Sequence, residues 1–191
     1  MQADTGFPAP NEPAMGFVRD DEHVFPVRVY YEDTDVGGVV YYANYLRFAE
    51  RARSEMLRYL GCPLGNLQAG DGVTIAVRRC EADYFVPARF DDALEIRTGN
   101  VEMEAASLWL DQAVWRGDEE LARLRVRLAC LKQNGRPSRV PETLRTALRP
   151  FVKGAAKTAQ FSPNSAVMMR SDTESGGQVP ETIEKKEEEQ V

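Results

Sequence analysis

Apolar residues recur at steps of three and four between residues 42 and 60, and this spacing predicts one long amphipathic helix. The apolar stripe consists of Tyr45, Phe48, Ala49, Ala52, Met56 and Leu60. The opposite face, which we expect to be exposed, carries Arg47, Glu50, Arg51, Arg53, Glu55 and Arg58. Gly61 and Pro63 follow directly, and both favour an end to the helix at residue 60.

Segments rich in β-branched and aromatic residues, several of them alternating apolar and polar positions, predict five strands around this helix. They cover residues 24–31, 73–85, 93–104, 107–115 and 121–132. Short connections between the last four indicate antiparallel neighbours. Residues 61–72 are expected to be a loop, and residues 141–151 a short final helix. The pattern therefore predicts an α+β fold, in which a curved antiparallel sheet wraps one helix and its open edges invite a second copy.

The two ends of the chain lack this periodicity. Residues 1–22 are rich in proline, glycine and acids and are expected to be a mobile leader, before a domain over residues 23–153. Residues 154–191 contain the run KKEEEQ and are expected to be a disordered acidic tail. No apolar run approaches the roughly 18 residues of a membrane span, and no signal peptide is recognisable, so a cytoplasmic location is expected.

Composition narrows the chemistry. A net charge of −6 argues against general nucleic-acid binding. The three cysteines have no metal-ligand spacing, and neither a metal nor a cofactor is predicted. The single histidine, His23, lies at the edge of the leader, which disfavours histidine-based catalysis and makes a carboxylate the expected acid or base.

Two acids and two glycines stand immediately before the predicted helix, in the run DTDVGG. Asp33 and Asp35 lie two residues apart, so in an extended chain their side chains face the same way. Gly37 and Gly38 lack side chains and would let a ligand approach the backbone. The helix start offers free N–H groups that can stabilise an oxyanion. This combination suits attack on an acyl carbon, with a carboxylate as general base or nucleophile; solvated turn acids are the simpler alternative.

A longer run around these acids resembles a known family. The stretch VRVYYEDTDVGGVVYYANYLRFAERAR is similar to the opening motif of the hot-dog-fold acyl-CoA thioesterases. The resemblance is to the bacterial branch associated with the Tol–Pal cell-envelope system (YbgC-like) and to the related hydroxybenzoyl-CoA thioesterases. The segment DYFVPARFDDALEI resembles a loop of the same family, and the likeness covers roughly residues 24–150. It implies hydrolysis of a short- to medium-chain or aromatic acyl-CoA by a homodimer or homotetramer.

The resemblance also implies roles for particular residues. Asp35 matches the catalytic carboxylate, whereas Asp33 is expected to hold the loop. The backbone N–H of Tyr42 matches the group that polarises the thioester carbonyl, at a position where Tol–Pal relatives usually carry histidine. Gly37, Gly38 and Ser107 are the expected substrate contacts.

Four further residues are candidates for coenzyme A contacts or for the catalytic acid. Arg78, Arg79 and Arg89 are candidates for the phosphates of coenzyme A, and Glu50 is a second candidate acid on the helix. The competing function is a hot-dog scaffold that binds acyl-carrier or cell-envelope (Tol–Pal) partners without catalysis. A hydratase is disfavoured, because the resemblance gives such enzymes a histidine in the site.

Overall fold

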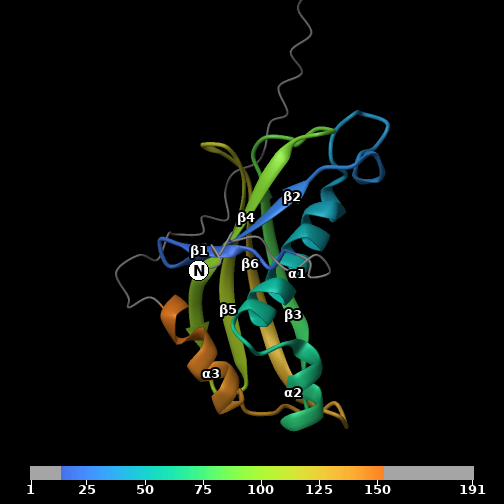
Figure 1. The fold of residues 1–191 in the computed structure, drawn as a ribbon. Helices are drawn as coiled ribbons and strands as arrows, with labels where there is room; N and C mark the ends of the chain where they lie inside the picture. Colours follow the sequence, from blue (N-terminus) through green and yellow to red (C-terminus); the bar gives the residue numbers. More distant parts are fainter. Residues whose placement is uncertain (1–13, 153–191) are drawn as a thin grey trace, which may run out of the picture.

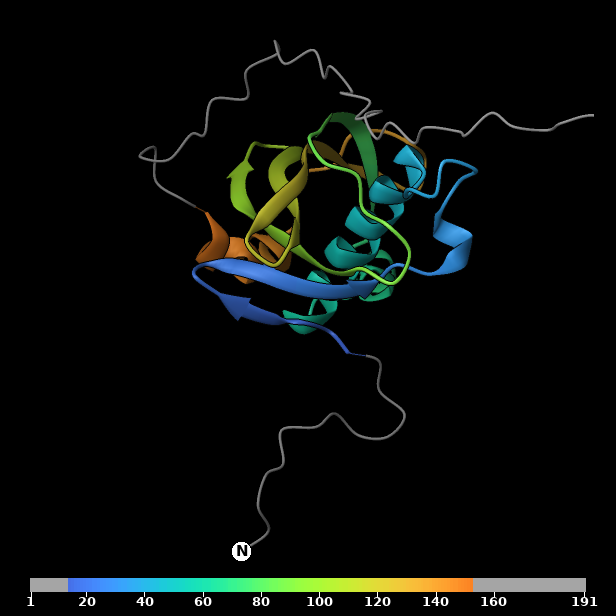
Figure 2. The same cartoon turned by 90° about the horizontal axis from the view of Figure 1, so that it is seen from above.

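The computed structural model describes residues 14–152 and contains one six-stranded antiparallel sheet, in the order β1-β2-β4-β5-β6-β3. The strands are β1 (Phe17–Arg19), β2 (Glu22–Arg28), β3 (Val73–Tyr84), β4 (Ala93–Met103), β5 (Ser107–Arg116) and β6 (Glu119–Lys132). The long helix α1 (Tyr42–Tyr59) runs along the sheet, and the view from above shows the sheet curving around it (Figures 1 and 2). The predicted α+β fold, a hot dog, is confirmed.

The core forms between α1 and the concave face of the sheet. Tyr45, Phe48, Ala49, Ala52 and Met56 are all buried, as the three- and four-residue spacing predicts. Alternate residues of β4, β5 and β6 meet them from the sheet, because side chains of a strand point to opposite faces in turn. These inward residues include Leu94, Ile96, Leu110, Val114, Leu124 and Val126. This packing therefore fixes the position of α1 on the sheet, including the position of its first turn.

Two residues of α1 depart from the predicted exposed face, because Arg53 and Glu55 are both half-buried. Arg53 was placed on the exposed face, but it is half-buried, and its Nη1 donates to Oε1 of Gln112 at 2.6 Å. Gln112 in turn donates to the carbonyl of Ala49 at 2.9 Å and to the hydroxyl of Thr98 at 3.0 Å. Burial lowers the pKa of Arg53 from its ordinary value. The prediction for Arg53 failed because the acceptor comes from β5, which the helical period alone does not reveal.

Two short elements were missed. Residues 61–72, predicted as a loop, contain the helix α2 (Leu64–Gly70), whose one buried residue, Leu67, is too little to create a visible period. The predicted leader also contains structure, because residues 17–22 form β1 and the start of β2. Asp20 and Asp21 turn between these strands with φ of 52° and 61°, a conformation that suits a two-residue hairpin.

The ends of the other elements differ by only a few residues from the prediction. β2 stops at Arg28 because the chain turns into a short 3₁₀ segment, η1 (Tyr31–Asp33). The final helix is α3 (Glu142–Leu148), followed by a 3₁₀ turn, η2 (Arg149–Phe151). Residues 1–13 of the predicted leader and the whole predicted tail lie outside the described residues. Between residues 14 and 152, no helix has the length and apolar character to cross a membrane.

Candidate active site

The acids lie in a small hairpin that leads into α1, and we call residues 33–41 the acid loop. Thr34 pairs with Val40, and the N–H of Asp35 donates to the carbonyl of Val39 at 3.0 Å. The tip is closed by a bond of 3.0 Å from the N–H of Gly38 to the carbonyl of Asp35. The loop is therefore a hydrogen-bonded turn that presents its tip beside the start of the helix (Figure 1).

Asp33 is buried and holds this loop together, as expected. Its Oδ2 accepts the N–H of Tyr30 at 2.9 Å. Its carbonyl accepts the N–H of Tyr41 at 3.0 Å and the side-chain amide of Asn44 at 2.9 Å. These bonds join the start of the acid loop to the first turn of α1.

Asp35 differs from Asp33 in being exposed. Its Oδ1 accepts the N–H of Gly37 at 2.8 Å, whereas its Oδ2 has no hydrogen bond to any described residue. A Cβ on Gly37 would lie 3.1 Å from Oδ1, so a larger residue there would press on the carboxylate. Gly38 has φ of +71°, a conformation that glycine adopts without strain, and a Cβ there would meet open space. One carboxylate oxygen is thus held and the other is available.

The first turn of α1 carries the backbone N–H of Tyr42, the predicted oxyanion donor. Within residues 14–152 the backbone N–H of Tyr42 has no hydrogen-bond acceptor, as expected for the first residue of a helix. The carbonyl of Tyr42 accepts the hydroxyl of Tyr84 at 3.2 Å, and the two rings meet edge to face. Burial raises the pKa of Tyr84, which keeps its hydroxyl a neutral donor. An exposed carboxylate and a free N–H therefore flank the same short stretch of chain.

Within one chain, Ser107 lies far from the acid loop. The other end of β5, at Arg116, contacts residues 87 and 92 near the acid loop. Ser107 begins β5 at the end opposite Arg116, roughly 30 Å away at about 3.3 Å per residue. Its hydroxyl donates to Glu104 at 2.6 Å and lies 3.2 Å from the guanidinium of Arg127. A coenzyme contact from Ser107 to a substrate at Asp35 would therefore need a second chain.

Glu50, the second candidate acid, and His23, the single histidine, both lie outside the acid loop. Glu50 is exposed on α1 and accepts the hydroxyl of Ser54 at 2.8 Å. His23 is not on a mobile segment but fully buried on β2, with Nε2 2.8 Å from the carbonyl of Met15. Its ring packs on Tyr59, which follows Tyr42 by roughly 25 Å at about 1.5 Å per residue. His23 is therefore far from the acid loop.

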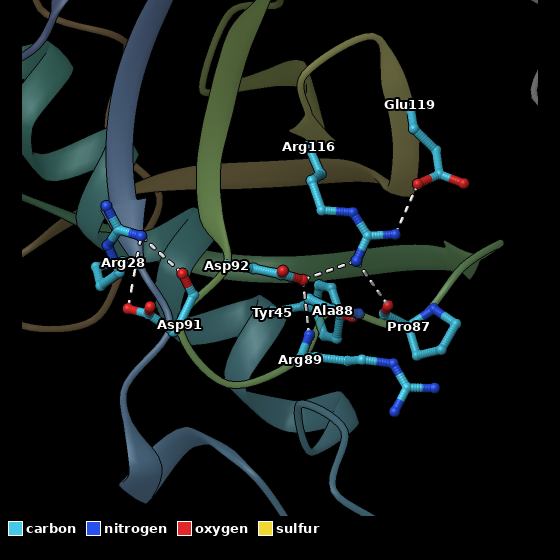
Figure 3. Close-up of polar contacts among 9 residues, drawn as sticks. All are labelled: Arg28, Tyr45, Pro87, Ala88, Arg89, Asp91, Asp92, Arg116 and Glu119. Atoms are coloured by element: carbon cyan, nitrogen blue, oxygen red, sulfur yellow. Dashed lines mark hydrogen bonds and ion pairs between the residues drawn. The ribbon is translucent and has the colours of Figure 1, made fainter.

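The three arginines proposed for phosphate binding are exposed but scattered. Arg78 lies where the register of β3 against β6 shifts, and Arg79 forms an ion pair with Glu81 at 2.6 Å. Arg89 is in the loop between β3 and β4, and its side chain points away from its neighbours (Figure 3). Among residues 14–152, no three His, Cys, Asp or Glu side chains are placed to hold a metal ion.

The structure adds a second loop to the site, residues 85–92, which we call the crossing loop. Ala88 in this loop donates its N–H to the hydroxyl of Tyr45 at 2.8 Å, and its carbonyl accepts the N–H of Val40 at 2.8 Å. Asp92 pairs with Arg116 at 2.7 Å (Figure 3). These contacts cannot be recognised from the sequence, in which Tyr45 is an ordinary core residue of the apolar stripe.

Comparison with known proteins defines the class. Residues 29–148 match the thioesterase-like superfamily, and the chain belongs to it. The chain is 42% identical over 112 residues to the acyl-CoA thioesterase YbgC of Haemophilus influenzae, covering 59% of this chain and 82% of that protein. It is 47% identical over 97 residues to the acyl-CoA thioester hydrolase YbgC of Escherichia coli O157:H7, covering 51% and 72%.

Solved structures agree with this assignment. A probable thioesterase from Bartonella henselae superposes with a TM-score of 0.61 at 37% identity, covering 63% of this chain and 99% of that one. A hypothetical protein from Thermus thermophilus superposes with a TM-score of 0.64 at 32% identity, covering 70% and 99%. The predicted family and enzyme class, a thioester hydrolase, are confirmed.

Proposed function

We propose that this protein hydrolyses an acyl-CoA to the free acid and coenzyme A, with Asp35 as its catalytic carboxylate. The proposal is carried by one observation: on a loop that leads into α1, neither Oδ2 of Asp35 nor the N–H of Tyr42 has a hydrogen-bond partner among residues 14–152. The relatives named as acyl-CoA thioesterases support the substrate class.

The geometry supports a division of labour between these two groups. A thioester carbonyl whose oxygen accepts the N–H of Tyr42 becomes more electrophilic, and that N–H stabilises the oxyanion formed on attack. Asp35 then either removes a proton from a water molecule that attacks the carbonyl carbon, or attacks that carbon itself to form a mixed anhydride that water cleaves afterwards. In both routes the C–S bond breaks and coenzyme A leaves as its thiol. Because the role of Tyr42 is a backbone role, tyrosine serves here as well as histidine.

The edge of the sheet supports a homodimer as the active form. β3 lies at one edge of the sheet and its residues 77–80 are exposed. No other strand of residues 14–152 pairs with its outer side, so a second copy could do so. Antiparallel pairing of two β3 strands would place Tyr84 of one chain near Val73 of the other. Ser107 pairs with Ala129, which pairs with Ala76 of β3, so this pairing would bring the partner's Ser107 toward the acid loop.

The dimer has a direct test. Val77 is 54% exposed on β3, and Val77→Glu would place repelling charges where two copies meet. Sedimentation should show the wild type as a dimer or a tetramer and the variant as a monomer. A wild type that sediments as a monomer at assay concentrations would rule this arrangement out. The cytoplasmic location and the Tol–Pal association stay predictions.

Hydrolysis is tested with a panel of acyl-CoAs that runs from short to medium chains and includes aromatic acyl groups. Release of the coenzyme thiol is followed for the wild type and for Asp35→Ala. We expect turnover of at least one substrate by the wild type and its loss in the variant. Equal rates would remove Asp35 from the mechanism. Turnover of none, together with capture of an acyl-carrier or envelope protein, would favour the scaffold alternative.

A further inference from the structure

The acid loop is not attached to α1 by its own backbone alone. Val39 and Val40 form its outer strand, and Val39 pairs with Arg89 of the crossing loop in an isolated antiparallel bridge. The N–H of Val40 donates to the carbonyl of Ala88 at 2.8 Å. On its other side, Val39 accepts the N–H of Asp35. The position of Asp35 therefore depends on where residues 88 and 89 lie.

Ala88 is tied to the helix through a single side chain. Its N–H donates to the hydroxyl of Tyr45 at 2.8 Å, in a place where Ala88 is fully buried and Tyr45 is 3% exposed. The ring of Tyr45 is itself fixed between Phe48 and Tyr84, with centroid distances of 6.3 and 5.4 Å. Burial is the main effect on this hydroxyl and raises its pKa, so it remains neutral. The Tyr45 hydroxyl is therefore an acceptor whose position relative to α1 is fixed.

The far end of the crossing loop is held by charge. Oδ2 of Asp92 accepts the N–H of Arg89 at 2.8 Å and pairs with Nη1 of Arg116 at 2.7 Å (Figure 3). The backbone of this end also joins Val29, through bonds of 3.0 and 3.1 Å involving Asp92 and Asp91. The bonds of Asp92 thus fix one end of the crossing loop. The hydroxyl of Tyr45 fixes the distance of residues 88 and 89 from α1.

We propose that the hydroxyl of Tyr45 is a positioning group, which sets the Asp35 carboxylate against the Tyr42 N–H through Ala88 and Val40. This inference rests on the proposed function, since it assigns a reason for the rate rather than a new reaction. Tyr42 and Tyr45 lie on one helix, so the Tyr42 N–H and the hydroxyl share a rigid element. Two hydrogen bonds of Ala88, one with Val40 and one with Tyr45, fix the position of the acid loop relative to that helix. Tyr45 does not touch the substrate.

The test removes the hydroxyl and keeps the ring. Tyr45→Phe leaves the buried N–H of Ala88 without its acceptor, so the crossing loop should shift away from α1. A misplacement of about 1 Å can cost about a hundredfold in rate, and we expect kcat to fall roughly ten- to hundredfold with KM little changed. Tyr59→Phe is the matched control, because Tyr59 lies on the same helix and its hydroxyl has no hydrogen bond to residues 14–152. It should keep wild-type kinetics.

A second readout does not depend on catalysis. Amide exchange at Val40 should quicken at least fivefold in Tyr45→Phe, while exchange at Leu124 in β6 stays unchanged. Asp92→Asn, which keeps an acceptor for the N–H of Arg89, should retain more activity than Asp92→Ala.

An unchanged kcat in Tyr45→Phe, or unchanged exchange at Val40, would overturn the proposal. An inactive Asp35→Ala beside a fully active Tyr45→Phe would refute only this inference. A wild type without turnover would contradict the proposed function and the catalytic consequence of this inference. The exchange rates would still decide whether Tyr45 holds the acid loop.

Discussion

Replacing Gln112 with methionine tests how much the hydrogen bonds between α1 and the sheet contribute to stability. Gln112 is 1% exposed, and the unbranched methionine fills a similar volume, so the main change is the loss of polar atoms. The variant loses the acceptor of Arg53 at 2.6 Å and the donors to Thr98 and Ala49. A hydrogen bond to a charged group contributes about 1.5–3 kcal/mol and a neutral one about 1. These three bonds together amount to about 3.5–5 kcal/mol, and we expect the free energy of unfolding to fall by about that much.

Urea unfolding of a double-mutant cycle isolates the Arg53 share. Once Arg53→Met has removed the guanidinium, Gln112→Met should cost about 1.5–3 kcal/mol less than in the wild type, because no half-buried charge is left without its acceptor. Arg51→Met, on the exposed face of the same helix, is the control and should show no coupling. Costs for Gln112→Met and Arg53→Met that add within about 0.5 kcal/mol would refute this reading of the core.

Two further predictions concern His23 and the acid loop. Burial holds the pKa of His23 below its ordinary value of 6.5, so the unfolded chain takes up a proton more readily. Stability should therefore fall as the pH drops below about 6.5, and His23→Gln should flatten that part of a thermal-unfolding pH series; equal slopes would contradict it. Gly37→Ala should lower kcat roughly three- to tenfold by pressing on Oδ1 of Asp35. Gly65→Ala, whose added Cβ meets nothing within 4 Å, should leave kcat unchanged, and equal effects of the two would argue against that contact.

The long elements were predictable from the sequence because each buries one face. The stripe of α1 and the alternation in β4, β5 and β6 carry that information directly. β1 and α2 were missed because three exposed residues and one buried leucine create no period. Arg53 was misplaced for a different reason, since its polar partner lies 59 positions away on the sheet.

The candidate site divides in the same way. Asp33, Asp35 and the helix start are neighbours in sequence, so local spacing and a family motif were enough to select them. Tyr45 and Ala88 are 43 positions apart, and only folding brings the hydroxyl of one to the N–H of the other. Ser107 lies at the far end of β5, so its predicted role depends on how two chains meet.

The proposed mechanism requires the Asp35 carboxylate, acting together with the N–H of Tyr42, for thioester hydrolysis. Its most direct test is kcat for Asp35→Asn, which keeps the shape and the bond to Gly37 but removes the charge. On the best substrate of the wild type, we expect a loss of about 10²–10⁴-fold. Asp118→Asn, an exposed acid in the β5–β6 turn, should retain full activity. An Asp35→Asn enzyme as fast as the wild type would show that the Asp35 carboxylate has no catalytic role.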